Sequence, residues 1–511
     1  MLVPLTVSDF IRRGALVYGE RTGVIDEPDQ PAASLGEITY ADLAERARAI
    51  ARAMERLGIR EGERVAMVTH NSARLLAAIF GVCGFGRILV PVNFRLSRAE
   101  VAYIVEQSGA RVLFVDPELR DDLAGVPCEH TFVLGEDEHL FADSGGEPTP
   151  WSAPDENATA TINYTSGTTA RPKGVQLTHR NLWTNAMMMG LHLGVTDRDV
   201  YLHTLPMFHC NGWGMPFVCA GLGVPQVVLR KVDGPEILRR VERHGVTLMC
   251  GAPAVVATVL DAAKNWDGPV PGRGRVRIIV AGAPPPSRTI ARVEEELGWE
   301  FIQIYGLTET APLLTVNRSR AEWDGLGTQE RAAKLVRAGN PAVGVELSVD
   351  PKGEVLARSN VVLAGYWDNP AETERCLEGG WFHTGDGGSL DDDGYLTISD
   401  RRKDVIITGG ENVSSIEVED VLFSHPDVAE VAVIGVPDAK WGETIKALVV
   451  CREGATVTEA ELIDYCKTRA ARFKAPSSVE FRDALARTAT GKLQKFKLRA
   501  PYWEDRGRKV N

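Results

Sequence analysis

The spacing of apolar residues near the start of the chain predicts a helix followed by a buried strand. After Thr39, which can cap a helix, apolar side chains recur every three or four positions as far as Leu57, and Gly58 can end the helix. The apolar run 65–68 that follows is typical of a strand buried on both faces.

Alternation of strand and helix continues through the middle of the chain. Apolar runs predict strands at 112–115, 276–280 and 301–304. A helical spacing between Ile290 and Leu297 separates the last two strands. Such alternation indicates parallel α/β layers, in which ligands bind beyond the carboxyl ends of the strands.

After about residue 345 the pattern changes to short strands separated by glycines, which continue as far as Asp400. A charged run at 400–404 then precedes a segment with a different periodicity. That segment predicts two helices, at 416–422 and 459–472, and two strands, at 428–436 and 446–450.

The fold class that these patterns predict is α/β, with two domains joined by a hinge. We expect a large N-terminal domain with several sheets over residues 1–400 and a small α+β domain over residues 404–511. Residues 401–403 would form the hinge. A chain of 511 residues is long enough to need at least two cores.

Charge and cysteine content narrow the function classes. A net charge of −12 argues against general binding to nucleic acid or to anionic membranes. The eight cysteines lack metal-ligand spacing, which favours a reducing cytoplasm over a disulfide or zinc framework. The apolar run 75–86 is too short for an integral membrane segment, so we expect a cytoplasmic protein. The sequence leaves the oligomeric state open, a homodimer included.

The stretch 164–174 carries the chemistry of a polyphosphate site. It reads Tyr-Thr-Ser-Gly-Thr-Thr-Ala-Arg-Pro-Lys-Gly and follows an alternating run, 158–164, that predicts a strand. Hydroxyls and backbone N–H groups in a loop of small residues can turn toward an anion, and Arg171 and Lys173 add positive charge. The spacing is not that of a Walker A loop. The alternative is a solvated turn rich in threonine and glycine.

Four further motifs follow in order. They are Tyr-Gly-Leu-Thr-Glu at 305–309, Trp-Phe-His-Thr-Gly-Asp at 381–386, Asp-Arg-Arg-Lys-Asp at 400–404 and Thr-Gly-Lys at 490–492. With the loop, they resemble the acyl-adenylate-forming superfamily, which includes acyl- and aryl-CoA synthetases, peptide-synthetase adenylation domains and firefly luciferase. The resemblance covers essentially the whole chain and favours the acyl- and aryl-CoA synthetase branch.

The resemblance implies a site for ATP and Mg²⁺. Thr308 would contact the α-phosphate and Glu309 would bind Mg²⁺, although a helix cap explains the same pair without the family. Asp386 would accept the ribose hydroxyls, with an Asx-turn as the alternative. The implied cofactor-binding residues are Thr165, Ser166, Gly167, Thr168, Thr169 and Lys173 for the phosphates, Gly282, Ala283, Pro284, Tyr305 and Gly306 around adenine, and Asp386 and Arg401 for ribose.

Two further catalytic residues follow from the resemblance. His209 lies in Phe-His-Cys-Asn-Gly-Trp, at the family's gate to the acyl pocket, although a histidine with such neighbours is most often packed in a core. The sequence of this segment resembles that of a subgroup of the family that acts on short, branched, thioether or aromatic acids. Trp213 would shorten the acyl pocket if its side chain pointed inward. Lys492 would bridge the carboxylate and the α-phosphate, where one comparable donor is worth roughly 2.7–4 kcal/mol. The alternative for Lys492 is a solvated loop lysine.

The resemblance also implies a site for coenzyme A. Gly409 and Gly410 would line the pantetheine tunnel, although glycine pairs are ordinary at turns. Trp441, Phe473 and Lys474 resemble the surface that binds CoA in this branch.

These features predict an ATP-dependent carboxylic acid–CoA ligase, an AMP-forming acyl-CoA synthetase of fatty or aryl acid metabolism. Its small domain would rotate about Lys403 between two half-reactions. The expected cofactors are ATP, Mg²⁺ and coenzyme A, and the expected partner is a small carboxylic acid.

One residue departs from the family pattern. Ala170 stands where the phosphate loop commonly has glycine, and a positive φ would strain alanine by about 1 kcal/mol or more. The alternatives are therefore an enzyme that performs only the thioester-forming half on a supplied acyl-adenylate and a non-catalytic adenylate-binding protein.

Overall fold

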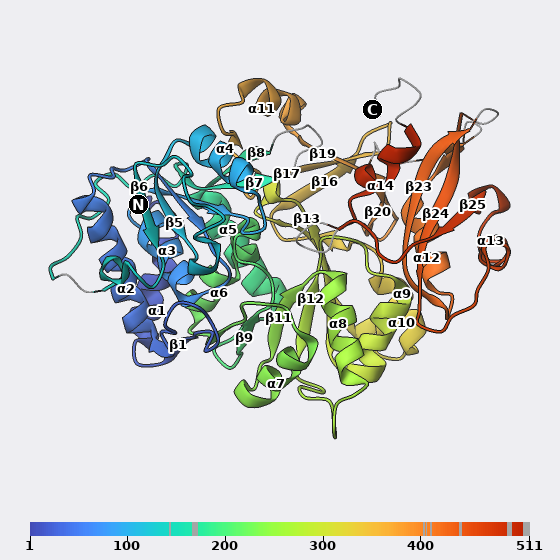
Figure 1. Cartoon of the computed structure of the whole chain (residues 1–511), viewed down its shortest axis with the longest axis horizontal. Helices are drawn as coiled ribbons and strands as arrows, with labels where there is room; N and C mark the ends of the chain where they lie inside the picture. Colours follow the sequence, from blue (N-terminus) through green and yellow to red (C-terminus); the bar gives the residue numbers. More distant parts are fainter. Residues whose placement is uncertain are drawn as a thin grey trace.

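The computed structural model describes residues 1–142, 145–165, 172–401, 404, 406–408, 411–438, 442–487 and 493–503. Within these ranges a large α/β body precedes a smaller unit of sheet and helices (Figure 1). The helices are α1 (Ser8–Tyr18), α2 (Tyr40–Arg56), α3 (Ala73–Cys83), α4 (Arg98–Ser108), α5 (His179–Leu193), α6 (Met215–Leu222), α7 (Gly234–His244), α8 (Pro253–Ala263), α9 (Ser287–Arg292), α10 (Thr328–Leu335), α11 (Pro370–Cys376), α12 (Ser415–Phe423), α13 (Glu459–Lys467) and α14 (Lys495–Trp503).

Two large sheets form the N-terminal body. One has the order β15-β14-β13-β12-β11-β9-β10-β1-β2, and the other has the order β18-β8-β7-β4-β3-β5-β6. Their strands are β1 (Thr22–Ile25), β2 (Glu37–Thr39), β3 (Arg64–Val68), β4 (Ile88–Val92), β5 (Ala110–Val115), β6 (His130–Val133), β7 (Thr159–Thr165), β8 (Lys173–Thr178), β9 (Tyr201–His203), β10 (Gln226–Val228), β11 (Leu248–Gly251), β12 (Arg277–Val280), β13 (Glu300–Gly306), β14 (Leu313–Asn317), β15 (Asn340–Pro341) and β18 (Gly365–Tyr366).

Two smaller sheets follow along the chain. A four-stranded sheet consists of β16 (Val345–Val349), β17 (Glu354–Ser359), β19 (Phe382–Leu390) and β20 (Leu396–Arg401). The sheet of the C-terminal unit contains β21 (Ile406–Thr408), β22 (Glu411–Val413), β23 (Val428–Asp438), β24 (Gly442–Cys451) and β25 (Ser478–Phe481).

The predicted parallel layers are confirmed. Strands β11, β12 and β13 run parallel, with Val280 of β12 opposite Gln303 of β13. Strands β3, β4 and β5 are also parallel neighbours. The carboxyl ends of β12 and β13 therefore meet at one edge, where Tyr305 and the residues after it begin.

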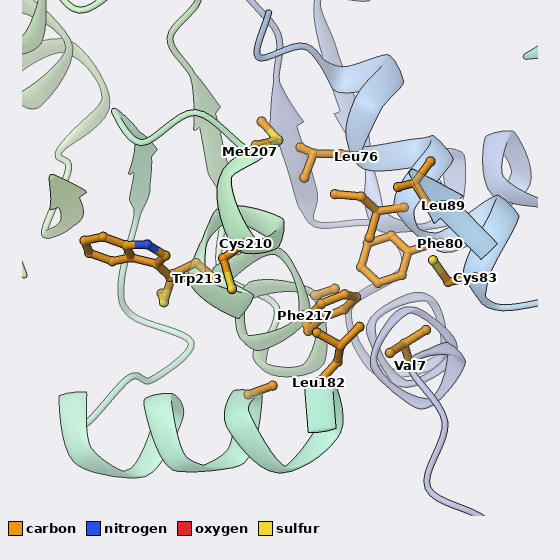
Figure 2. Packing of buried hydrophobic residues seen from close by; sticks show 14 of the residues in the cluster. Val7, Leu76, Phe80, Cys83, Leu89, Leu182, Met207, Cys210, Trp213 and Phe217 are labelled. Atoms are coloured by element: carbon orange, nitrogen blue, oxygen red, sulfur yellow. The ribbon is translucent and has the colours of Figure 1, made fainter. Parts of the chain in front are cut away.

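An apolar core fills the space between the two large sheets. Phe80 of α3 and Phe217 of α6 pack edge to face with ring centroids 5.8 Å apart. Figure 2 shows this pair close to Leu182 of α5 and Val7, with Trp213 lying apart from the pair. Helices α3, α5 and α6 therefore pack in the core between the two sheets.

Local sequence signals explain where α2 begins and ends. The Thr39 hydroxyl accepts from the N–H of Asp42, and the Asp42 carboxylate accepts from the N–H of Thr39. Gly58, just beyond the helix, has φ +69°. The helix predicted at 459–472 is shorter than expected, since α13 ends at Lys467. The hydroxyl of Thr468 donates to the carbonyl of Tyr465 and competes with continuation of the helix.

The C-terminal unit has its own apolar cluster, which includes Val433 and Leu462. It contacts the large body through α12, where the carboxylate of Asp420 accepts from the N–H of Ser287 at 3.2 Å. Among the helices of the described residues, none is long and apolar enough to cross a bilayer.

Candidate functional site

The turn after β13 places Thr308 and Glu309 beyond the edge of the nine-stranded sheet. The hydroxyl of Thr310 accepts from the N–H of Leu307 at 2.9 Å and lies 2.6 Å from the carbonyl of Pro312, which fixes the turn. Gly306 is required here because an added Cβ would lie 1.5 Å from that carbonyl oxygen. The backbone therefore holds both predicted ligands rigidly at the strand end.

Glu309 is half-buried and accepts a hydrogen bond from a residue that the sequence analysis did not identify. The hydroxyl of Tyr366 donates to its Oε1 at 2.9 Å. The N–H of Leu363 also donates to the backbone carbonyl of Glu309 at 2.8 Å. Both the side chain and the backbone of Glu309 are thus held by one segment of the chain.

Asp386 and Tyr305, predicted to bind ribose and adenine, lie together. The hydroxyl of Tyr305 donates to Oδ2 of Asp386 at 2.8 Å, and Asp386 is only 7% exposed. The hydroxyl of Thr384 accepts from the N–H of Asp386 at 3.1 Å. Arg401 is the backbone partner of Asp386 across β19 and β20. The carboxylate is therefore oriented by its own turn and by the tyrosine.

The predicted opposing edge of the adenine site also lies near this point. Gly282, Ala283 and Pro284 follow β12, the parallel neighbour of β13, and all three are partly exposed. Gly282 has φ +95°, a conformation that glycine adopts without strain. The chain therefore turns sharply just beyond the sheet edge that carries Tyr305.

The two ends of the predicted phosphate loop lie on paired antiparallel strands. Thr165 of β7 and Lys173 of β8 are backbone partners. The ammonium of Lys173 forms an ion pair with Glu372 of α11. The intervening predicted residues, Ser166, Gly167, Thr168, Thr169, Ala170 and Arg171, lie outside the described residues.

The segment that carries His209 has an unusual backbone. Cys210, Asn211, Gly212 and Trp213 all have positive φ, between 46° and 59°, so they form a short left-handed turn. Each such non-glycine residue costs roughly 1–2 kcal/mol. The thiol of Cys210 lies 3.9 Å from the carbonyl of Thr308, which places the turn against the proposed phosphate ligand.

Buried amides hold the left-handed turn in place. The amide of Asn211 donates to the hydroxyl of Thr161 at 3.0 Å and to Asn163 at 3.3 Å. The amide of Asn185 donates to the carbonyl of Trp213 at 3.2 Å and accepts from the N–H of Leu313. These bonds stabilise a conformation that the side chains alone would not favour, and backbone strain of this kind is typical of functional sites.

Burial sets the chemistry of the thiol in this turn. Burial, followed by the nearby carboxylate of Glu309, raises the pKa of Cys210 well above its ordinary value. Cys210 therefore stays a neutral thiol and is not suited to act as a nucleophile. Its neighbour His209 is half-buried and lies at the start of the turn.

The structure describes only some of the site residues that were predicted in the C-terminal part of the chain. Phe473 is 49% exposed, and the ammonium of Lys474 pairs with Glu417 at 2.7 Å. Lys403, Gly409, Gly410, Trp441 and Lys492 lie outside the described residues, and of Arg401 only the backbone is described.

The donor set at Glu309 fits Mg²⁺. Among the described residues there is no group of three or more histidine, cysteine, aspartate or glutamate side chains that could hold a metal ion. Mg²⁺ typically takes one or two protein carboxylates and completes its shell with water and substrate phosphates. A single carboxylate beside the predicted phosphate ligand Thr308 is therefore sufficient, whereas a zinc site would need more ligands.

Comparisons with known proteins cover nearly the whole chain. The model of the AMP-binding enzyme family matches residues 15–367, and the model of the AMP-binding enzyme C-terminal domain matches residues 417–492. A 2-methylpropanoate–CoA ligase of Humulus lupulus is 38% identical over 97% of this chain and 95% of its own length. The 4-hydroxybutyrate–CoA ligase 2 of Metallosphaera sedula is 37% identical over 98% of this chain and 94% of its own length.

Solved structures agree with these matches. O-succinylbenzoate–CoA synthetase from Bacillus subtilis, in complex with ATP and a magnesium ion, has a TM-score of 0.82 and 30% identity over 96% of this chain and 99% of that chain. A second structure of that enzyme holds its acyl-adenylate intermediate, with a TM-score of 0.82 and 30% identity over 98% of this chain and 99% of that chain.

Proposed function

This chain belongs to the AMP-binding enzyme family, and from that premise we propose how its residues divide the work between two half-reactions. It is an ATP-dependent acid–CoA ligase that acts through an acyl-adenylate. The substrate carboxylate attacks the α-phosphorus of ATP and pyrophosphate leaves. The thiol of CoA then attacks the acyl carbonyl and AMP leaves.

Nucleotide binding is assigned to the residues at the strand ends. Asp386, oriented by Tyr305, accepts the ribose hydroxyls. Thr308 contacts the α-phosphate, and Glu309 is the protein ligand of Mg²⁺. The metal ion, when bound, neutralises charge that builds up on the phosphates. The observation that carries this assignment is the Tyr305–Asp386 hydrogen bond, which joins two motifs far apart in sequence at one point.

The remaining roles divide between the loops and the C-terminal unit. Lys173 and the loop from Thr165 to Thr169 hold the β- and γ-phosphates, and Lys492 stabilises the charge of the adenylation transition state. Rotation about Lys403 then exchanges Lys492 for the CoA-binding residues. Those residues are Gly409, Gly410, Trp441, Phe473 and Lys474.

The substrate class that we propose is short carboxylic acids of about four carbons. Trp213 is 4% exposed and lies on the left-handed turn whose Cys210 contacts Thr308. A buried indole on this turn would limit the length of acyl chain that fits, provided that it points into the acyl pocket. The two relatives named for 2-methylpropanoate and 4-hydroxybutyrate support the same size class.

A panel of acids tests this proposal. Straight acids from two to twelve carbons, 2-methylpropanoate, 4-hydroxybutyrate and benzoate would each be supplied with ATP, Mg²⁺ and CoA, and the acyl-CoA and AMP formed would be measured by mass spectrometry. We expect the highest kcat/KM for acids of about four carbons, because each methylene that the pocket cannot accept costs about 1–3 kcal/mol. A maximum at eight carbons or more would contradict the short-acid proposal.

A further inference from the structure

Residues 363–367 connect two motifs that lie far apart in sequence. On one side, the N–H of Leu363 donates to the carbonyl of Glu309 at 2.8 Å. On the other side, Tyr366 pairs with Val175 of β8, and the N–H of Trp367 donates to the carbonyl of Gly174 at 2.7 Å. One short segment is therefore bonded both to the proposed metal ligand and to the strand that follows the phosphate loop.

The side chain of Tyr366 makes the same connection. Its hydroxyl donates to Oε1 of Glu309 at 2.9 Å, and the ammonium of Lys173 lies 5.3 Å from the centre of its ring. Tyr366 is buried, so this contact is shielded from solvent. The hydroxyl of Tyr366 therefore contacts the proposed metal ligand while its ring faces the proposed phosphate ligand.

Helix α11 contacts both Tyr366 and Lys173. The hydroxyl of Thr373 accepts from the N–H of Tyr366 at 2.8 Å. Glu372 pairs with Lys173 and also accepts from Arg375 at 3.0 Å, and the pKa of its carboxyl is lowered chiefly by Arg375. The position of Lys173 is therefore set by a carboxylate on one side and an aromatic ring on another.

We propose that Tyr366 is a positioning residue that couples the metal-binding carboxylate of Glu309 to the phosphate-binding ammonium of Lys173. This inference rests on the proposed roles of Glu309 and Lys173 in binding Mg·ATP. The hydrogen bond engages Oε1 and so fixes the rotation of the carboxylate, which determines where its second oxygen faces. The ring holds the ammonium beside the same polyphosphate. Tyr366 thereby sets the distance between the two charged groups.

Equilibrium binding separates this role from general packing. The affinity for ATP would be measured by calorimetry over a range of free Mg²⁺ concentrations, with no acid or CoA present. The Mg²⁺ midpoint is the free Mg²⁺ concentration that gives half of the full increase in ATP affinity. In Tyr366→Phe we expect this midpoint to rise about tenfold, because a charge-assisted hydrogen bond is lost. ATP affinity at saturating Mg²⁺ should stay near that of the wild type. Tyr366→Leu should also weaken ATP binding at saturating Mg²⁺, because the ring under Lys173 is lost.

Tyr395→Phe is the matched control. Tyr395 is buried, and its hydroxyl accepts from Arg320 at 3.3 Å in another part of the large body. The Mg²⁺ midpoint of Tyr395→Phe should equal that of the wild type. An unchanged midpoint in Tyr366→Phe, with the far-UV circular dichroism intact, would overturn the proposal. Because the binding assay needs no turnover, it remains readable even if the acid panel contradicts the proposed substrate class.

Discussion

At the scale of single residues, Asp386 makes the sharpest prediction for nucleotide binding. Asp386→Ala should lower the affinity for ATP and AMP by about 1–3 kcal/mol, or about fivefold to 150-fold, because two ribose hydroxyls lose their acceptor. Tyr305→Phe keeps the ring but removes the hydroxyl that orients Asp386, so its loss should be smaller. Calorimetry with AMP measures both variants, and unchanged affinity in Asp386→Ala would count against the ribose assignment.

Trp213 makes a prediction about chain length. Trp213→Leu should move the preferred acid toward six to eight carbons (roughly 1–3 kcal/mol of discrimination per misfit methylene), measured as kcat/KM across the acid panel. Trp299→Leu is the control, since Trp299 is fully buried in a different apolar cluster of the large body. If both variants lose activity on all acids equally, Trp213 acts through stability and not through pocket length.

The residue types of the candidate site were predictable, but their contacts were not. The motifs around Tyr305, Glu309 and Asp386 were identified from the sequence, and the family that they resemble is confirmed. The hydrogen bond of Tyr366 to Glu309 was missed, because nothing in the local sequence connects residues so far apart. The local signal was a Gly-Tyr pair shortly before a helix that Asn369 caps and Pro370 begins, which is typical of an ordinary turn.

At the scale of elements, the left-handed turn at 210–213 makes a prediction about stability. Asn211→Ala and Asn211→Gly both remove the buried amide, which should cost about 1–3 kcal/mol in the free energy of unfolding. Alanine should cost about 1 kcal/mol more than glycine, because φ is +53° at this position. Urea unfolding followed by tryptophan fluorescence compares the two variants, and equal stabilities would show that the backbone there carries no strain.

The phosphate loop carries a prediction that comes from the sequence alone. If Ala170 is strained where the family commonly has glycine, Ala170→Gly should raise acid-dependent pyrophosphate release, by about fivefold for 1 kcal/mol. Thioester formation from a supplied acyl-adenylate should barely change. A variant with no gain in the first assay would mean that Ala170 is neutral, and both half-reactions would then proceed without a penalty from the loop.

Element types were predicted well where local signals agree, and poorly where a side chain competes with the backbone. Thr39 and Gly58 bound α2 as expected, because capping depends on neighbouring residues only. The left-handed turn was not predicted, since its conformation depends on Asn163 and Asn185 from other elements. The early end of α13 at Lys467 depends on one hydroxyl of Thr468.

At the scale of the whole molecule, Lys492 separates the two half-reactions. Lys492→Ala should lower acid-dependent pyrophosphate release by about a hundredfold to a thousandfold, the loss seen when one transition-state donor is removed. Conversion of a supplied acyl-adenylate and CoA to thioester should stay near the wild-type rate, because the proposed rotation turns Lys492 away from the cleft. A parallel loss of both steps, with the fold intact by circular dichroism, would reject that division of labour.

The two-part architecture could be predicted from the change of pattern after Asp400, and the α/β class is confirmed. The contacts between the parts could not. Asp420 of α12 faces Ser287 of α9, and the guanidinium of Arg288 donates to the carbonyl of Ser424 at 3.3 Å. These are isolated polar residues on helix surfaces, and their sequence positions carry no sign of a partner in the other domain.

The pairing of β18 with β8 has a consequence for how the protein folds while it is being synthesised. Strand β8 is complete at Thr178, but its neighbour begins only at Gly365. At about 5–20 residues per second, the ribosome adds the roughly 190 residues between them in about 10–40 seconds. During that interval one edge of the seven-stranded sheet has unpaired backbone groups, which are a template for wrong partners. The proposed nucleotide site is therefore among the last parts of the large body to form, and the growing chain is most exposed to aggregation at this sheet edge.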